Sequence, residues 1–367
     1  MIYFDNNATT SVHPEIKKLI PEWLEIYANP SAVHSSGKKA RDLLEKARAN
    51  IVSDLRLDSY KLIFTSTGTE ANALALQFLF SEEIDDRREI LISSIEHSCI
   101  YELKNSLTEY GYRVKQIPVD KNGVIDLDFV EEHCTDETAL VSVMLANNET
   151  GVIQPLKEIR RITDEYGIYF HCDAIQGIGK MENQLKEIDA DSYAFSGHKL
   201  HALKGVSCTV YRTKPTPIFI GGGQERGLRS GTENLLGILS FEKAISLILK
   251  NEKKNQETLL QNRNYLESEL EKHAAIIISK NVPRLFNTSC VEFSIENEKM
   301  LIELDKRKIA VSRGSACNAG SWEPSRSLLS MKISKERANR IIRISQSIFN
   351  TKSEIDNLVE SIKEILN

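Results

Sequence analysis

The pattern of hydrophobic and polar positions alternates between two periods over the first two-thirds of the chain. Short apolar runs typical of buried strands alternate with segments in which apolar residues recur every three or four positions, as on one face of a helix. The predicted strands are 61–65, 89–94, 112–117, 140–145, 168–172, 191–195 and 206–211. The predicted helices between them include 40–55, 69–80, 97–110 and 155–166. Strands that alternate with helices favour a largely parallel sheet covered on both faces.

The pattern changes after the glycine run at 221–223. A long helical region with a polar face is predicted over about 234–272. Further strands and helices are then predicted at 275–279, 289–295, 298–306, 309–311, 341–344 and 352–366. We therefore expect an α/β protein with a large domain over 13–255 and a smaller α+β domain over 256–367, joined by residues 1–12.

Composition and charge narrow the classes of function. The 367 residues include 47 Lys and Arg and 52 Asp and Glu, which gives a formal net charge of −5. A general nucleic-acid binder would need a basic surplus or stripe. No apolar run approaches the roughly 18 residues of a membrane helix, and residues 1–5 lack the features of a signal peptide. We expect a cytoplasmic enzyme that contacts neither nucleic acid nor membrane.

Six cysteines are spread along the chain without a CxxC pair: Cys99, Cys134, Cys172, Cys208, Cys290 and Cys317. This usage does not predict a disulfide framework. Some of them lie beside a histidine, as His171 lies beside Cys172. Adjacent side chains on a strand point to opposite faces, so this pair is poorly placed to bind one ion. We expect no metal site.

Two residues just past predicted strands could carry chemistry. Lys199 follows the strand 191–195, and a lysine in this place could form a Schiff base, although a loop lysine is more often a solvated charge. Asp173 ends the strand 168–172, where a buried carboxylate needs a cation or hydrogen bonds. The ring nitrogen of pyridoxal 5′-phosphate (PLP) would be such a partner. The alternative is an Asp that caps the next turn.

Two further signals lie at other strand ends. Residues 66–70 read Ser-Thr-Gly-Thr-Glu and open a helix, where backbone N–H groups can bind a phosphate or the side chains can simply cap the helix. His97 follows the strand 89–94 and could lie over a flat ring or face water. Open α/β sheets bind ligands at the carboxyl ends of their strands, so these signals could meet at one site.

The order of these motifs resembles that of the fold-type I, class-V PLP-dependent transferases, and in particular the cysteine desulfurases of the NifS/IscS type. The motifs that carry the resemblance lie at 3–10, 29–31 with His34, 64–70, 96–97, 147–151, 173–176, 196–199, 221–225, 229–232 and 312–324. They run almost from end to end of the chain.

The resemblance implies several cofactor-binding positions: Gly68, Thr69, His97, Asn148, Asp173, Gln176, Ser196, His198, Lys199 and Thr232. Lys199 would attach PLP covalently, Asp173 would pair with the ring nitrogen, and Gln176 would bind the ring hydroxyl. His97 would stack on the ring and serve as an acid and base.

The resemblance also implies how phosphate and substrate are bound. The phosphate would be held by Gly68, Thr69, Ser196 and His198. Thr232 would reach the phosphate of the other subunit of a homodimer. Asn148 and Arg343 would bind the substrate L-cysteine, with the Arg343 guanidinium on its α-carboxylate, a bidentate contact that a lysine could not make.

Cys317 would be the nucleophile, with Lys199 and His97 as the other catalytic residues. Segment 312–321 is made almost entirely of small residues, a composition that favours a mobile loop, and Arg313 could help the thiolate to form. The alternative is a buried structural cysteine. The implied reaction yields alanine and a persulfide on Cys317, which passes sulfur to an acceptor protein for iron–sulfur cluster assembly or for thiolation of tRNA or a cofactor.

Three other functions stay open: a selenocysteine lyase, a class-V aminotransferase, which would not need Cys317, and a non-catalytic scaffold or PLP-binding paralogue. The chain departs from the family pattern at 200–204, which lacks a Gly-Pro turn, at Thr67, and at 343–347, which lacks a final glycine. It ends at Asn367, without the tail by which the IscS branch docks its scaffold. This ending favours a NifS-like enzyme.

Overall fold

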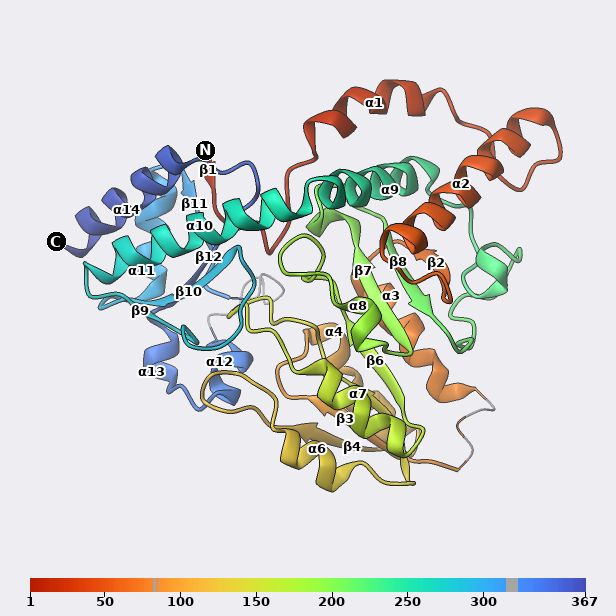
Figure 1. Ribbon diagram of the computed structural model, residues 1–367, viewed down its shortest axis with the longest axis horizontal. Coiled ribbons are helices and arrows are strands. Elements are labelled where there is room, and N and C mark those ends of the chain that lie inside the picture. Colours follow the sequence, from red (N-terminus) through yellow and green to blue (C-terminus); the bar gives the residue numbers. More distant parts are fainter. Residues whose placement is uncertain (82–83, 85, 315–322) are drawn as a thin grey trace.

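The computed structural model describes residues 1–81, 84, 86–314 and 323–367. Its largest element is a seven-stranded sheet with the strand order β2-β8-β7-β6-β5-β3-β4 (Figure 1). The strands are β2 (Lys61–Thr65), β3 (Glu89–Ser93), β4 (Arg113–Ile117), β5 (Thr138–Ser142), β6 (Tyr169–Asp173), β7 (Ser192–Ser196) and β8 (Ser207–Tyr211). β8 is antiparallel to both of its neighbours, whereas the other pairs are parallel. The predicted, mainly parallel sheet is confirmed.

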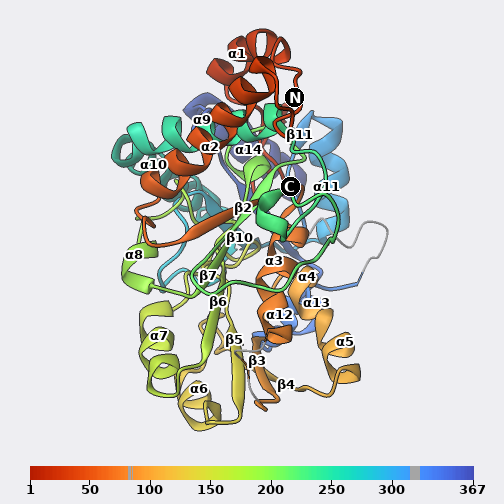
Figure 2. The same ribbon diagram turned by 90° about the vertical axis from the view of Figure 1, so that its right-hand side faces the viewer.

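Helices cover both faces of this sheet (Figure 2). The first face carries α6 (Leu127–His133), α7 (Leu156–Glu165) and α8 (Leu185–Ile188), and the second carries α3 (Gly68–Leu76), α4 (Ser98–Tyr101) and α5 (Leu103–Glu109). Successive residues of a strand point to opposite faces. Phe170 and Cys172 of β6 accordingly belong to one apolar cluster, and Tyr169 belongs to another. Near one edge of the sheet, α2 (Ser35–Asp54) packs against α9 (Leu235–Lys250).

The C-terminal part of the chain has sheets and a core of its own. β9 (Ile276–Ile277), β10 (Thr288–Glu292) and β12 (Ile341–Ser345) form an antiparallel sheet. β1 (Ile2–Tyr3) returns here from the N-terminus and pairs with β11 (Ile309–Ala310). The helices of this part are α10 (Glu252–Glu271), α11 (Asn297–Lys306), α12 (Arg326–Ser330), α13 (Lys335–Ala338) and α14 (Lys352–Leu366). The predicted division at residues 255 and 256 stays a prediction.

Several element boundaries differ from the predicted ones. The predicted strand 140–145 is displaced, because β3 ends at Ser93 and residues 143–145 no longer pair with it, although the Val143 and Leu145 N–H groups still donate to β6. The predicted helices 97–110 and 234–272 are each divided, at Glu102 and at Asn251. The helix α1 (Pro14–Leu24) was not predicted, since Pro21 interrupts its pattern. Within the described ranges, no helix is long and apolar enough to cross a membrane.

A buried ion pair ties α2 to the loop that precedes α9. Both terminal nitrogens of Arg48 lie 2.8 Å from carboxylate oxygens of Glu225, and the two side chains are 7% and 2% exposed. Glu225 also accepts the Phe64 N–H of β2 at 2.7 Å. Glu225 and Arg226 have φ values of 47° and 60°, which residues with a side chain rarely adopt. The ion pair therefore holds a strained turn in place.

We predict that Arg48→Met lowers the free energy of unfolding by about 3–5 kcal/mol, because it leaves the Glu225 carboxylate buried without its cation. Urea unfolding of both proteins would measure the difference. Arg161→Met is the matched control, since its ion pairs with Glu131 and Glu165 are exposed; it should leave the midpoint unchanged. Equal midpoints for Arg48→Met and the wild type would contradict the assignment.

Candidate active site

A cavity of about 220 Å³ lies at the carboxyl ends of β6 and β7. Its walls contain most of the positions that the sequence assigned to the site: Gly68, Thr69, His97, Asn148, Asp173, Gln176, Ser196, His198, Lys199 and Arg343. Thr232 is not in these walls and lies on an exposed loop. Cys317 lies outside the described residues. These residues come from six separate parts of the sequence and meet in one cavity.

Lys199 is directed at the N-terminal segment. It ends the short 3₁₀ turn Gly197–Lys199 that follows β7. Its Nζ donates to the backbone carbonyls of Asn7, at 2.6 Å, and Ala8, at 2.7 Å. Asn7 and Ala8 both line the cavity, and neither was assigned a role from the sequence. The amine is therefore fixed at the cavity wall by backbone groups.

Asp173 ends a chain of buried hydrogen bonds. Its carboxylate accepts the Ile175 N–H at 3.0 Å and the Asn72 amide nitrogen at 2.9 Å. The Asn72 oxygen lies 3.0 Å from Nε2 of His171, whose Nδ1 lies 2.8 Å from the Ser192 hydroxyl. Burial lowers the pKa of His171 to about 3, so the ring is neutral. If Nε2 carries its proton, every bond in the chain has one donor and one acceptor.

Burial and hydrogen bonding have opposite effects on the pKa of the Asp173 carboxyl. Burial raises the pKa of the Asp173 carboxyl, while the Ile175 N–H and the positive charge of His97 act in the opposite direction. A carboxylate that faces two donors and sits in a cavity wall is suited to a cationic N–H group such as a protonated pyridine ring.

The other walls of the cavity fit the remaining groups of PLP. At the start of α3, a Cβ on Gly68 would lie 2.5 Å from the end of the Ile175 side chain, which would have to shift to make room for it. Thr67 caps this helix by accepting the Glu70 N–H, so the departure from the family residue supplies an N-cap. The Ser196 hydroxyl accepts from Ser207 at 2.9 Å and can itself donate. A helix start with hydroxyl donors suits a phosphate.

Two buried groups near the ring-binding region are held neutral. Burial, and next the charge of Lys199, lower the pKa of His198 to about 4. Burial, and next the charge of Asp173, raise the pKa of Glu96 to about 8. One Glu96 oxygen accepts the Met144 N–H at 2.6 Å, and the other has no hydrogen-bond partner among the described residues. A protonated Glu96 therefore leaves Asp173 as the carboxylate of this region.

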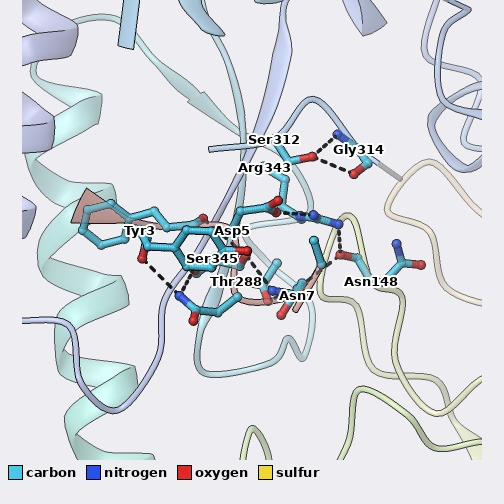
Figure 3. Close-up of polar contacts among 12 residues, drawn as sticks. Tyr3, Asp5, Asn7, Asn148, Thr288, Ser312, Gly314, Arg343 and Ser345 are labelled. Carbon is cyan, nitrogen blue, oxygen red and sulfur yellow. Dashed lines mark hydrogen bonds and ion pairs between the residues drawn. The ribbon is translucent and has the colours of Figure 1, made fainter. Parts of the chain in front are cut away.

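Arg343 lies on β12 with its side chain 2% exposed (Figure 3). Its terminal nitrogens donate to the Asn148 carbonyl at 3.0 Å and to Asp5 at 2.5 Å. Its Nε is buried and has no partner in the described part of the chain. The guanidinium thus keeps unused N–H donors for an incoming carboxylate. Its backbone bridges to Ser312, near the start of the segment that carries Cys317.

Sequence reasoning missed Asn7, Asn72 and Lys180. Asn72 lies four residues after Gly68 on α3, and this spacing puts both on one face of the helix. That spacing was the available signal for Asn72. Asn7 lies in the motif at 3–10 but was given no role, and Lys180 carried no signal. Their contacts are made with residues far along the chain or inside an irregular turn.

Comparisons with known proteins agree with this geometry. Residues 2–358 match the family model for class-V aminotransferases. The chain is 37% identical to the cysteine desulfurase NifS of Azotobacter vinelandii, over 100% of this chain and 92% of that protein. A solved NifS-like protein matches with a TM-score of 0.92 and 34% identity, covering 100% of this chain and 99% of that one. SspA in complex with cysteine matches with a TM-score of 0.81 and 28% identity, covering 96% and 100%.

The chain therefore belongs to the class-V aminotransferase family, whose enzymes depend on PLP. Within that family it is one of the cysteine desulfurases of the NifS and IscS type. The predicted fold class, a fold-type I PLP-dependent transferase, is confirmed by the structural matches.

We predict that Glu96→Gln changes how stability depends on pH. Because the pKa of folded Glu96 is raised from 4.5 to about 8, the folded protein holds a proton that the unfolded chain has lost. The free energy of unfolding should therefore fall as pH rises through this window. Gln mimics the protonated acid, so the variant should lose this fall and become the more stable protein near pH 8.

Urea unfolding of the cofactor-free proteins at several pH values would measure this difference. Glu102→Gln, an exposed change on the same segment, is the control and should follow the wild type. Parallel pH profiles for Glu96→Gln and the wild type would refute the prediction.

Proposed function

We propose that the chain is a cytoplasmic cysteine desulfurase that takes sulfur from L-cysteine, releases L-alanine and leaves a persulfide on Cys317. The observation that carries the proposal is the cavity in which Lys199, Asp173, His97 and Arg343 meet. The full-length similarity to cysteine desulfurases supports the same reaction. A related solved structure is described as a complex with cysteine.

The cavity residues would bind different parts of the cofactor and the substrate. PLP, when bound, supplies the electron sink that stabilises negative charge at the substrate α-carbon. Asp173 would hold the ring nitrogen and Gln176 the ring oxygen. Arg343 would bind the substrate carboxylate through N–H donors that Asp5 and Asn148 leave unused. These contacts would fix the substrate at both ends.

Proton transfer and sulfur transfer would need mobile groups. The Lys199 amine would move the α-proton, and His97 would exchange a proton at the cavity wall. His97 lines the cavity and accepts the Cys99 N–H through Nδ1 at 3.2 Å, which orients its ring. The Cys317 thiolate would attack the substrate sulfur, so that the S–S bond forms as the carbon–sulfur bond breaks.

The persulfide would pass its sulfur to an acceptor protein, either an iron–sulfur scaffold or an enzyme that thiolates tRNA or a cofactor. We also propose that the chain acts as a homodimer in which Thr232 reaches the partner's phosphate site. The loop that carries Thr232 also carries Ile220, which is 91% exposed, and Tyr27 and Val33 are 90% and 86% exposed. In the proposed dimer, the partner would cover these apolar side chains and remove them from water.

The desulfurase proposal predicts equal amounts of alanine and sulfide from L-cysteine with PLP and a reductant. Cys317→Ser should abolish both products and keep the absorbance of the bound cofactor. Cys134→Ala is the control: this thiol is buried outside the cavity, and the variant should keep full activity.

Other outcomes of the same assay identify the alternatives. Sulfide production by Cys317→Ser at the wild-type rate would remove Cys317 from the mechanism. Amino transfer to a keto acid without sulfide would indicate an aminotransferase, and turnover restricted to selenocysteine would indicate a lyase.

The dimer proposal predicts that Ile220→Asp shifts the protein toward the monomer in sedimentation velocity, because a carboxylate in an apolar interface is desolvated without a partner. The matched control is Ile302→Asp on α11, at a side chain that is 48% exposed, and it should sediment like the wild type. A monomeric wild type, or an Ile220→Asp variant that stays dimeric, would contradict the proposed interface.

A further inference from the structure

Lys180 is a buried lysine behind the cofactor cavity that the proposed mechanism does not use. It ends the turn that follows β6, and its residue is 6% exposed. Its Nζ donates to the side-chain oxygen of Gln176 at 2.6 Å. No carboxylate among the described residues forms an ion pair with it. The partner of this amine is therefore an amide, which is unusual because buried lysines are usually paired with an acid.

The Lys180 contact fixes which way the Gln176 amide faces. The Lys180 amine donates to this contact, so the atom of Gln176 that it contacts is the oxygen, and the Asn7 carbonyl supports this assignment because it can only accept. The other end of the amide is then the NH₂ group, which donates to the Asn7 carbonyl at 3.1 Å. Asn7 and Gln176 both line the cofactor cavity. The N–H donors of Gln176 therefore lie on the cavity side.

The surroundings hold Lys180 in this position. Its carbonyl accepts the Phe286 N–H at 2.7 Å, and its own N–H donates to the Gly177 carbonyl at 3.1 Å. Its side chain also borders a cavity of about 30 Å³ that Lys199 borders from another side. Burial lowers the pKa of Lys180 well below its usual value, and the charges of Lys199 and Arg343 act in the same direction. The amine can thus bind the Gln176 oxygen without a counter-ion.

We propose that Lys180 is a positioning residue that holds the Gln176 amide with its NH₂ group toward the ring oxygen of PLP. The inference rests on the proposed role of Gln176 as the partner of that oxygen. Without Lys180, the amide oxygen loses its donor, and the Asn7 carbonyl alone is left to distinguish the two ends of the amide. A flipped amide would place an oxygen against the ring oxygen, and two acceptors repel each other.

The test measures cofactor binding, so it is independent of desulfurase turnover. Apoprotein is titrated with PLP to obtain the Kd and the absorption maximum of the bound cofactor. Lys180→Met should raise the Kd by roughly threefold to tenfold, the effect of one lost hydrogen bond, and should change the absorption maximum. In the Gln176→Leu background, Lys180→Met should have no further effect on either quantity.

Three further variants serve as the control, the conservative substitution and the replacement for a variant that does not fold. Lys186→Met, at an exposed lysine nearby, should bind PLP like the wild type. Lys180→Arg keeps a donor and should restore the wild-type spectrum. If Lys180→Met does not fold, as judged by circular dichroism, Lys180→Ala, which also has no donor, replaces it in both backgrounds. Equal losses with and without Gln176, or unchanged PLP binding in a folded Lys180 variant, would overturn the proposal.

Discussion

The site depends on keeping a carboxylate ionised at the buried end of a strand. Asp173 lies where β6 ends, and burial raises the pKa of its carboxyl. The Ile175 N–H and the Asn72 amide oppose this by donating to its two oxygens. The contact between the Asn72 oxygen and His171 orients this amide so that its NH₂ group faces Asp173. Much of the core between β6, β7 and α3 is therefore arranged around one negative charge.

A second constraint is that the first residues of the chain must reach this same place. Asn7 donates to the Asn148 carbonyl and to Thr288, and its backbone N–H donates to Ser345 (Figure 3). Its carbonyl then accepts from both Lys199 and Gln176. One backbone oxygen thus joins the main sheet to the C-terminal sheet. A shift of the N-terminal segment would therefore move both the Lys199 amine and the Gln176 amide, which face the cavity.

The sequence predicted the parts of the site that depend on local pattern. Asp173 and Lys199 could be found because each follows a short apolar run, and strand ends are where open sheets bind ligands. His171 could be predicted to lie on a strand, but not to bond Asn72, because that contact joins residues 99 positions apart. The boundary of β5 was also beyond local pattern, since it depends on where the neighbouring β3 stops.

The distribution of charge around the cavity determines which charged groups of a ligand it can bind. Burial holds His171, His198 and Lys180 at pKa values below their usual ones and Glu96 above its own. Burial thus favours the neutral forms of these groups over their charged forms. Formal charge then stays where a zwitterionic amino acid and a cationic ring would need it. A charge in a low-dielectric site acts strongly over short distances. Disfavouring charge on His171, His198, Lys180 and Glu96 therefore matters as much as the positions of Asp173 and Arg343.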